Sequence, residues 1–160
     1  MLRTLVAFGT RYGATAEIAD EIAEILRNQF NLEVDIINLE EFFPKKEDLE
    51  KYSNIIIGSG IKTGQWVNRA KRFLESKFEG KKVAIYVCSR RAGETDLYNY
   101  AYENYIRKII DKKLKIEPVA TEAFGGRKPM KNGEYYDNRD WDKIRDWTKH
   151  VGEIFSSQDS

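Results

Sequence analysis

Short apolar runs alternate with longer segments of helical periodicity along nearly the whole chain. The runs predict strands at residues 2–8, 34–37, 54–58 and 83–87, and a weaker strand at 118–124. The third and fourth runs are continuously apolar, which is typical of strands that are covered on both faces. The chain therefore favours a buried parallel sheet over an antiparallel one with a solvated face.

The segments between these runs carry apolar residues at helical spacing. They predict helices at residues 14–29, around 70–74, at 101–110 and at 141–155, and a short helix within the acidic segment 39–51. Strands that alternate with helices at this spacing form βαβ units, with helices on both faces of the sheet. We expect one α/β domain over residues 1–160, with a frayed tail from Ser156.

Composition excludes several classes of protein. The 160 residues are 41% hydrophobic and 33% charged, which is typical of a folded domain rather than a disordered chain. There are 27 Lys and Arg against 26 Asp and Glu, so net charge gives no reason to expect a nucleic-acid partner. No apolar run predicts a transmembrane segment, and the first ten residues indicate a strand rather than a signal peptide. The single cysteine and single histidine predict no disulfide and no metal site, and favour a cytoplasmic location.

The loop after the first strand has the composition of an anion site. It contains Thr10, Arg11, Tyr12, Gly13, Ala14 and Thr15 and leads directly into the first helix. The free N–H groups of a helix start, together with hydroxyl groups, suit a phosphate. The spacing matches neither the ATP-type P-loop nor the G-x-G-x-x-G dinucleotide loop. The alternative is that Thr15 only caps the helix and Gly13 only makes the turn.

This loop resembles the FMN-phosphate loop of the flavodoxin family. Its Thr-Arg-x-Gly-x-Thr pattern is more similar to the flavodoxin-like menaquinone-dependent protoporphyrinogen IX dehydrogenases, and Ile57–Gly64 resembles the loop after strand three in that group. The resemblance implies a flavodoxin-like three-layer sandwich with a five-stranded parallel sheet in the order 2-1-3-4-5. It also implies FMN as cofactor and an oxidoreductase or an electron carrier as function.

The resemblance further implies that two loops flank the flavin ring. The first supplies Ser59, Gly60, Ile61, Lys62, Thr63 and Gly64, and the second Ser89, Arg90, Arg91, Ala92, Gly93 and Tyr98. Trp66 and Tyr98 are candidates for stacking on the ring, with packing in the core as the alternative for each. Cys88 ends the fourth strand nearby, and an inert buried thiol is its expected state. We name no catalytic acid or base, because the flavin carries the electrons.

Lys62, Arg90 and Arg91 make these two loops basic, and a solvated rim of surface charge is the alternative to a role at the flavin. Cations beside the ring favour the negatively charged reduced flavin, so we expect a less negative potential than in acidic electron-carrier flavodoxins. A basic site edge also suits an anionic small-molecule substrate or an acidic redox protein, and a quinone is a further candidate.

Two other functions are alternatives to a flavin site. A phosphoacceptor signalling domain needs carboxylates after strands one and three, where this chain has Phe8-Gly9 and Gly58-Ser59. A flavin-free, flavodoxin-like interaction module stays open, because Tyr12 stands where many flavodoxins carry Thr or Ser. The segment 125–133 is short and polar and predicts no amphipathic helix for membrane docking.

Overall fold

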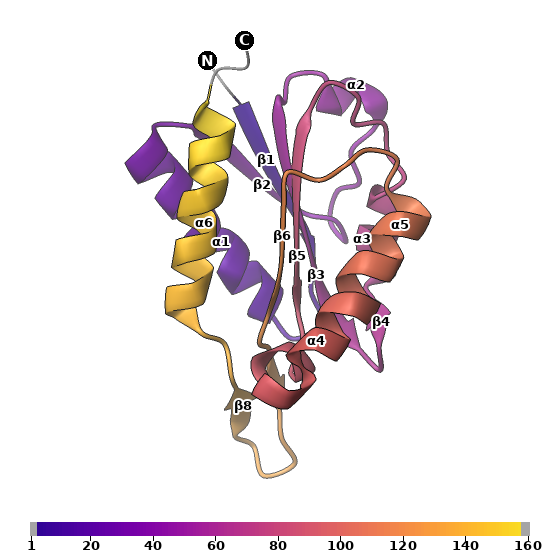
Figure 1. Cartoon of the computed structure of the whole chain (residues 1–160), viewed down its shortest axis with the longest axis vertical. Coiled ribbons are helices and arrows are strands. Elements are labelled where there is room, and N and C mark those ends of the chain that lie inside the picture. Colours follow the sequence, from indigo (N-terminus) through magenta and orange to yellow (C-terminus); the bar gives the residue numbers. More distant parts are fainter. Residues whose placement is uncertain (1–2, 158–160) are drawn as a thin grey trace.

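A computed structural model describes residues 3–157 of the chain (Figure 1). The strands are β1 Arg3–Gly9, β2 Glu33–Asn38, β3 Asn54–Lys62, β4 Gln65–Trp66, β5 Lys82–Cys88, β6 Ala120–Phe124, β7 Arg127–Pro129 and β8 Tyr135–Asp137. The helices are α1 Ala14–Phe30, α2 Lys46–Leu49, α3 Asn68–Phe73, α4 Tyr98–Ala101, α5 Lys108–Lys113 and α6 Trp141–Ser156. Single turns η1 Arg91–Gly93 and η2 Thr95–Leu97 precede α4, and a π-helical segment η3, Tyr102–Arg107, joins α4 to α5. The predicted strand start at Leu2 and the last three residues of the predicted frayed tail lie outside the described residues.

The main sheet confirms the predicted architecture. Its five parallel strands lie in the order β2-β1-β3-β5-β6, which is the expected order 2-1-3-4-5 in terms of the predicted strands. The winding reverses between β1 and β3, because β2 lies on one side of β1 and every later parallel strand lies on the other. In sheets of this type, ligands bind at such a reversal, outside the carboxyl ends of the strands.

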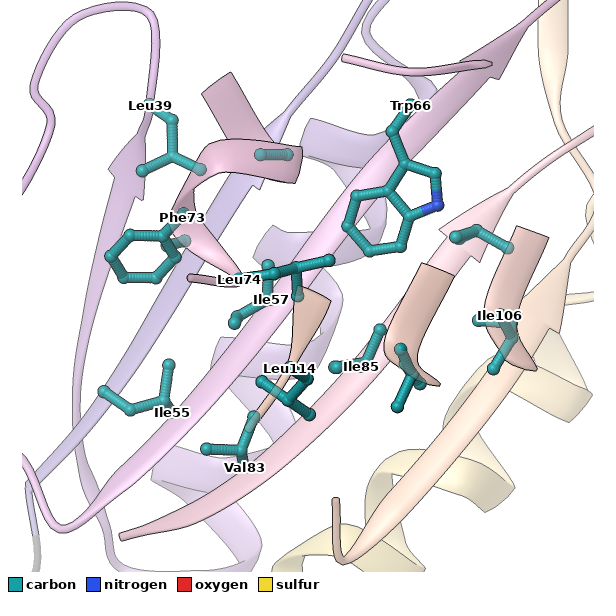
Figure 2. Close-up of a cluster of buried hydrophobic side chains, with 14 of the residues drawn as sticks. Leu39, Ile55, Ile57, Trp66, Phe73, Leu74, Val83, Ile85, Ile106 and Leu114 are labelled. Atoms are coloured by element: carbon teal, nitrogen blue, oxygen red, sulfur yellow. The ribbon is translucent and has the colours of Figure 1, made fainter. Parts of the chain in front are cut away.

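Helices cover both faces of the sheet and give three layers. Helices α1 and α6 lie on one face, and α3, α4 and α5 lie on the other (Figure 1). Alternate residues of each central strand enter opposite cores: Ile55 and Ile57 point to the α3–α5 side, whereas Ile56 packs on the α1–α6 side. Figure 2 shows Ile55, Ile57 and their neighbours in the α3–α5 core. Burial on both faces explains why these strands are continuously apolar in sequence.

Strand β3 is longer than predicted. It continues past Gly58 to Lys62 and turns back into β4, with Ile61 opposite Trp66 and Lys62 opposite Gln65. Thr63 and Gly64 make the turn with φ angles of 49° and 76°, as in a two-residue hairpin of type I′. The predicted loop after strand three is therefore mostly a hairpin, because backbone pairing extends beyond the apolar run.

Two further features differ from the prediction. The helix expected at 101–110 begins at Tyr98, ends at Lys113 and contains the π-helical segment η3. The polar segment after β6 forms the hairpin β7–β8, which extends from the end of the sheet (Figure 1).

Within residues 3–157, no helix has both the length and the apolar character required to cross a membrane.

Candidate functional site at the carboxyl ends of the strands

A cavity of about 720 Å³ opens where the chain winding reverses. Its walls come from the loop after β1, the β3–β4 hairpin, the loop after β5 and the start of the β7–β8 hairpin. This volume lies within the range of about 300–1,000 Å³ that is typical of small-molecule and cofactor sites.

The loop after β1 presents free backbone donors to this cavity. Gly13 adopts a φ angle of 86°, and its N–H group donates to Thr10 Oγ1 at 2.9 Å. Helix α1 then begins without a side-chain cap, and its first internal bond runs from Glu17 N–H to the Gly13 carbonyl at 3.1 Å. Thr10 therefore shapes the turn instead of capping the helix. The N–H groups of the first turn of α1, together with the positive end of the helix dipole, are left to an incoming anion.

Gly60 lets β3 approach this loop closely. A Cβ atom at residue 60 would lie 3.2 Å from Thr15 Oγ1 and 3.7 Å from the backbone nitrogen of Arg11. Thr15 itself is only 1% exposed, at the base of the cavity. A side chain at residue 60 would thus fill the space beside the free N–H groups, and its absence leaves room for a ligand against them.

Ser59 fixes the base of the β3–β4 hairpin. Its Oγ donates to the Gly60 carbonyl at 2.8 Å and accepts the N–H of Val67 at 3.0 Å. Trp66 on the return strand is buried, and its Nε1 donates to the Tyr105 carbonyl at 2.8 Å. These contacts assign Trp66 to the core, which is the alternative to ring stacking.

The cavity is strongly basic. Among the described residues that line it, six carry positive charge and Glu94 alone carries negative charge; the six are Arg11, Lys62, Arg90, Arg91, Arg127 and Lys128. Several are held by specific contacts: Arg91 Nη1 donates to the Tyr105 hydroxyl at 2.9 Å, and the Arg90 guanidinium lies 4.8 Å from the Tyr136 ring centroid. Positive charge focused in a cleft attracts anionic ligands.

Most of the residues predicted from the sequence line this cavity. Those that do are Thr10, Arg11, Tyr12, Ala14, Thr15, Gly60, Ile61, Lys62, Thr63, Gly64, Ser89, Arg90 and Arg91. Loops that are far apart in the sequence thus line one cavity. Contact between these residues and a flavin stays a prediction.

Five predicted residues lie outside the described lining: Gly13, Ser59, Ala92, Gly93 and Tyr98. Gly13 and Ser59 shape the two loops, and Ala92 is buried in the core. Tyr98 lies at a separate cavity of about 340 Å³, where its hydroxyl donates to Glu122 and Lys143 Nζ lies 4.1 Å from its ring centroid. Tyr98 thus belongs to the lining of this second cavity and not to that of the main one.

A group of lining residues is not predicted by the sequence: Glu94, Leu97, Tyr105, Gly126, Arg127, Lys128 and Tyr136. Tyr105 belongs to η3 and faces the β3–β4 turn, 3.9 Å from where a Cβ atom at Gly64 would stand. Glu94 and Leu97 lie between β5 and α4. Arg127, Lys128 and Tyr136 belong to the β7–β8 hairpin, and Gly126 directly precedes it. The Gly125-Gly126-Arg127 start of that segment was the only signal available in the sequence, because polar hairpins lack a strong apolar pattern.

Cys88 lines the cavity but is only 4% exposed. Burial raises the pKa of its thiol to about 12, and a hydrogen bond with Thr15 opposes that rise only in part. The thiolate is the reactive form of cysteine. The structure therefore indicates an inert thiol at the base of the site.

Comparison with known proteins gives a consistent result. The flavodoxin domain family matches residues 5–149. Protoporphyrinogen IX dehydrogenase [quinone] of Escherichia coli strain K12 is 24% identical over 112 residues, which are 68% of this chain and 60% of that protein. The chain therefore matches less than two thirds of the length of this relative.

Solved flavodoxins share the fold. Oxidised flavodoxin 1 from Bacillus cereus has a TM-score of 0.64 at 18% identity, covering 99% of both chains. A flavodoxin from the domain Archaea has a TM-score of 0.64 at 14% identity, covering 98% of this chain and all of its own.

Proposed function

The chain belongs to the flavodoxin domain family, and from this premise we propose that residues 1–160 form one FMN-binding redox domain. The observation that carries the proposal is the uncapped start of α1, whose free N–H groups open into a basic cavity of about 720 Å³. Phosphate binding at a helix start uses this donor set. The space beside Gly60 and the excess of positive charge both fit a phosphorylated flavin.

The residues of the chain have distinct tasks in this proposal. The Thr10–Thr15 loop binds the phosphate, and the β3–β4 turn and the loop after β5 hold the ring between them. Bound FMN supplies reversible uptake and release of electrons. Lys62, Arg90 and Arg91 stabilise negative charge in the ring region, which favours the reduced state. Contact with the Tyr105 hydroxyl keeps Arg91 in place while charge develops.

An oxidoreductase with an anionic reactant fits the site better than one with a cationic reactant. Six cations against one carboxylate around the described cavity disfavour positively charged substrates and basic redox proteins. The name of the Escherichia coli relative specifies protoporphyrinogen IX and a quinone. We propose these as the first candidate donor and acceptor, with an acidic electron-transfer protein as the second candidate partner.

Reconstitution with FMN tests the function. The apoprotein should take up about one FMN per chain on equilibrium dialysis, and the complex should be yellow with flavin absorbance bands. Anaerobic mixing with protoporphyrinogen, and then with a quinone, should bleach and restore those bands if these are reactants. A colourless protein at saturating FMN would favour the flavin-free interaction module instead.

A further inference from the structure

Arg127 begins the β7–β8 hairpin and reaches across to the loop that opens α1. Its Nη2 donates to the Tyr12 carbonyl at 3.1 Å, and its Nη1 donates to Glu17 Oε2 at 3.3 Å. The same Nη2 lies 3.3 Å from where a Cβ atom at Gly13 would stand. The guanidinium therefore lies beside the turn whose neighbouring N–H groups are free.

The guanidinium of Arg127 is incompletely paired. It has five N–H donors, and within residues 3–157 its two terminal nitrogens make one hydrogen bond each. Its Nε is buried and has no acceptor among the described residues. A buried donor without an acceptor is costly. Arg127 thus has unused N–H donors, and a further hydrogen-bond acceptor beside its guanidinium would stabilise it.

Glu17, the carboxylate partner of Arg127, has a second arginine. Arg139 Nη1 lies 2.7 Å from Glu17 Oε1, against 3.3 Å for Arg127. The Arg139 side chain is 4% exposed and is also held by Asp137 at 2.7 Å, whereas the Arg127 side chain is 24% exposed. Glu17 therefore keeps its stronger partner if Arg127 moves away, and no charge is left unpaired.

We propose that Arg127 is a phosphate ligand that makes the site selective for FMN over riboflavin. On binding, its guanidinium exchanges the Glu17 carboxylate for the phosphate monoester at the start of α1. Guanidinium groups match phosphate oxygens with paired N–H donors, and a phosphate with up to two negative charges is a stronger partner than a carboxylate already paired with Arg139. This inference rests on the proposed FMN site and adds a charged ligand from a distant hairpin.

Affinities for two flavins test this role, because riboflavin lacks the phosphate. Arg127→Met should weaken FMN binding at least tenfold, the scale expected for a charged hydrogen bond, and change riboflavin binding less than twofold. Arg127→Lys keeps the positive charge but loses the paired donors. Its affinity for FMN should therefore lie between the affinities of the wild type and of Arg127→Met. Lys131→Met is the matched control, because Lys131 is an exposed cation of the same hairpin outside the cavity lining.

Glu17→Gln separates phosphate binding from simple tethering of the hairpin. If Arg127 only holds the hairpin against α1, removing the charge of its partner should weaken FMN binding as Arg127→Met does. If Glu17 competes with the phosphate for Arg127, the variant should bind FMN two- to fivefold more tightly and riboflavin unchanged. Titration of flavin fluorescence measures both ligands on all variants.

Two results would overturn the role of Arg127 while the flavin site stands. One is equal weakening of FMN and riboflavin in Arg127→Met, and the other is weaker FMN binding in Glu17→Gln. If the wild-type protein binds neither flavin, the proposed function itself fails and the role of Arg127 fails with it.

Discussion

Single residues decide whether the end of β1 can receive a phosphate. Thr10 accepts the Gly13 N–H, Gly13 takes a φ angle of 86°, and Thr15 lies almost fully buried below the free N–H groups. Gly60 leaves open the space above Thr15 Oγ1. The sequence predicts all four residues at the site. The structure shows that Thr10 and Gly13 form the turn, that Thr15 lies at the base of the cavity and that Gly60 leaves space for a ligand.

Thr15→Asp should abolish FMN binding, because a carboxylate at this 1% exposed position would repel the phosphate at close range. We expect at least a hundredfold loss of affinity in equilibrium dialysis. Thr95→Asp introduces the same carboxylate at an exposed position outside the main cavity lining and should leave affinity within twofold of wild type. Unchanged FMN affinity in Thr15→Asp would place the phosphate elsewhere.

Cys88 should resist thiol reagents although it lines the cavity. With the thiol pKa raised to about 12 by burial, about one molecule in ten thousand carries the thiolate at pH 8, and the raised pKa keeps this fraction low until the solution becomes strongly alkaline. Ellman's reagent at pH 8 should label the folded protein at most slowly and the protein unfolded in guanidinium rapidly. Fast labelling of the folded protein would show that the thiol is accessible and activated.

At the scale of elements, hairpins and helix starts build the walls of the site. The β3–β4 hairpin places Lys62 and Gly64 beside the cavity, and its turn holds Thr63 at a φ angle of 49°. A residue with a branched β-carbon is strained in this left-handed region. Strain of this kind is kept where the surrounding structure or a bound ligand requires it.

Thr63→Asn should stabilise the apoprotein by about 0.5–1 kcal/mol, because Asn-Gly is the preferred sequence for this type of turn. Urea unfolding measures the free energy of unfolding. The control is Thr95→Asn, since Thr95 is exposed and has no positive φ angle, and we expect no gain there. Loss of stability in Thr63→Asn would mean that the Thr63 side chain makes a needed contact.

At the scale of the whole molecule, the sheet order and the distribution of charge act together. The reversal between β1 and β3 creates the cavity, and sequence-distant segments bring the six cations of the described lining to it. The net charge of the whole chain is only +1, so it does not reveal that positive charge is concentrated at the cavity. The electrostatic field at the cavity, rather than the total charge of the chain, acts on a ligand that enters it.

The double variant Lys62→Gln/Arg90→Gln should make the midpoint potential of the FMN-loaded protein more negative. Each lost charge should contribute on the order of 20 mV, the equivalent of about 1 kcal/mol for a two-electron couple. Anaerobic potentiometric titration measures the change, and Lys131→Met should leave the potential unchanged. If the double variant has the same midpoint potential as the wild type, Lys62 and Arg90 do not tune the flavin.

The sequence predicted the parallel sheet and most of the cavity lining, because both leave strong local signals. Continuous apolar runs such as Ile55–Ile57 are typical of buried strands, and glycine with hydroxyl residues at a strand end is typical of a phosphate loop. The β7–β8 hairpin and Arg127 left no comparable pattern, since their position depends on packing of segments more than 100 residues apart. The position of Tyr98 could not be predicted from its residue type either: an aromatic ring suits stacking on a flavin, but the Tyr98 hydroxyl donates to Glu122 beside the second cavity.

The most direct test of the central claim is a crystal structure of the protein with FMN. We predict density for the phosphate within hydrogen-bond distance of the backbone nitrogens between Thr10 and Thr15, with the ring between the β3–β4 turn and the loop after β5. Flavin bound with its phosphate away from the start of α1, or a site without flavin density at saturating FMN, would contradict the claim.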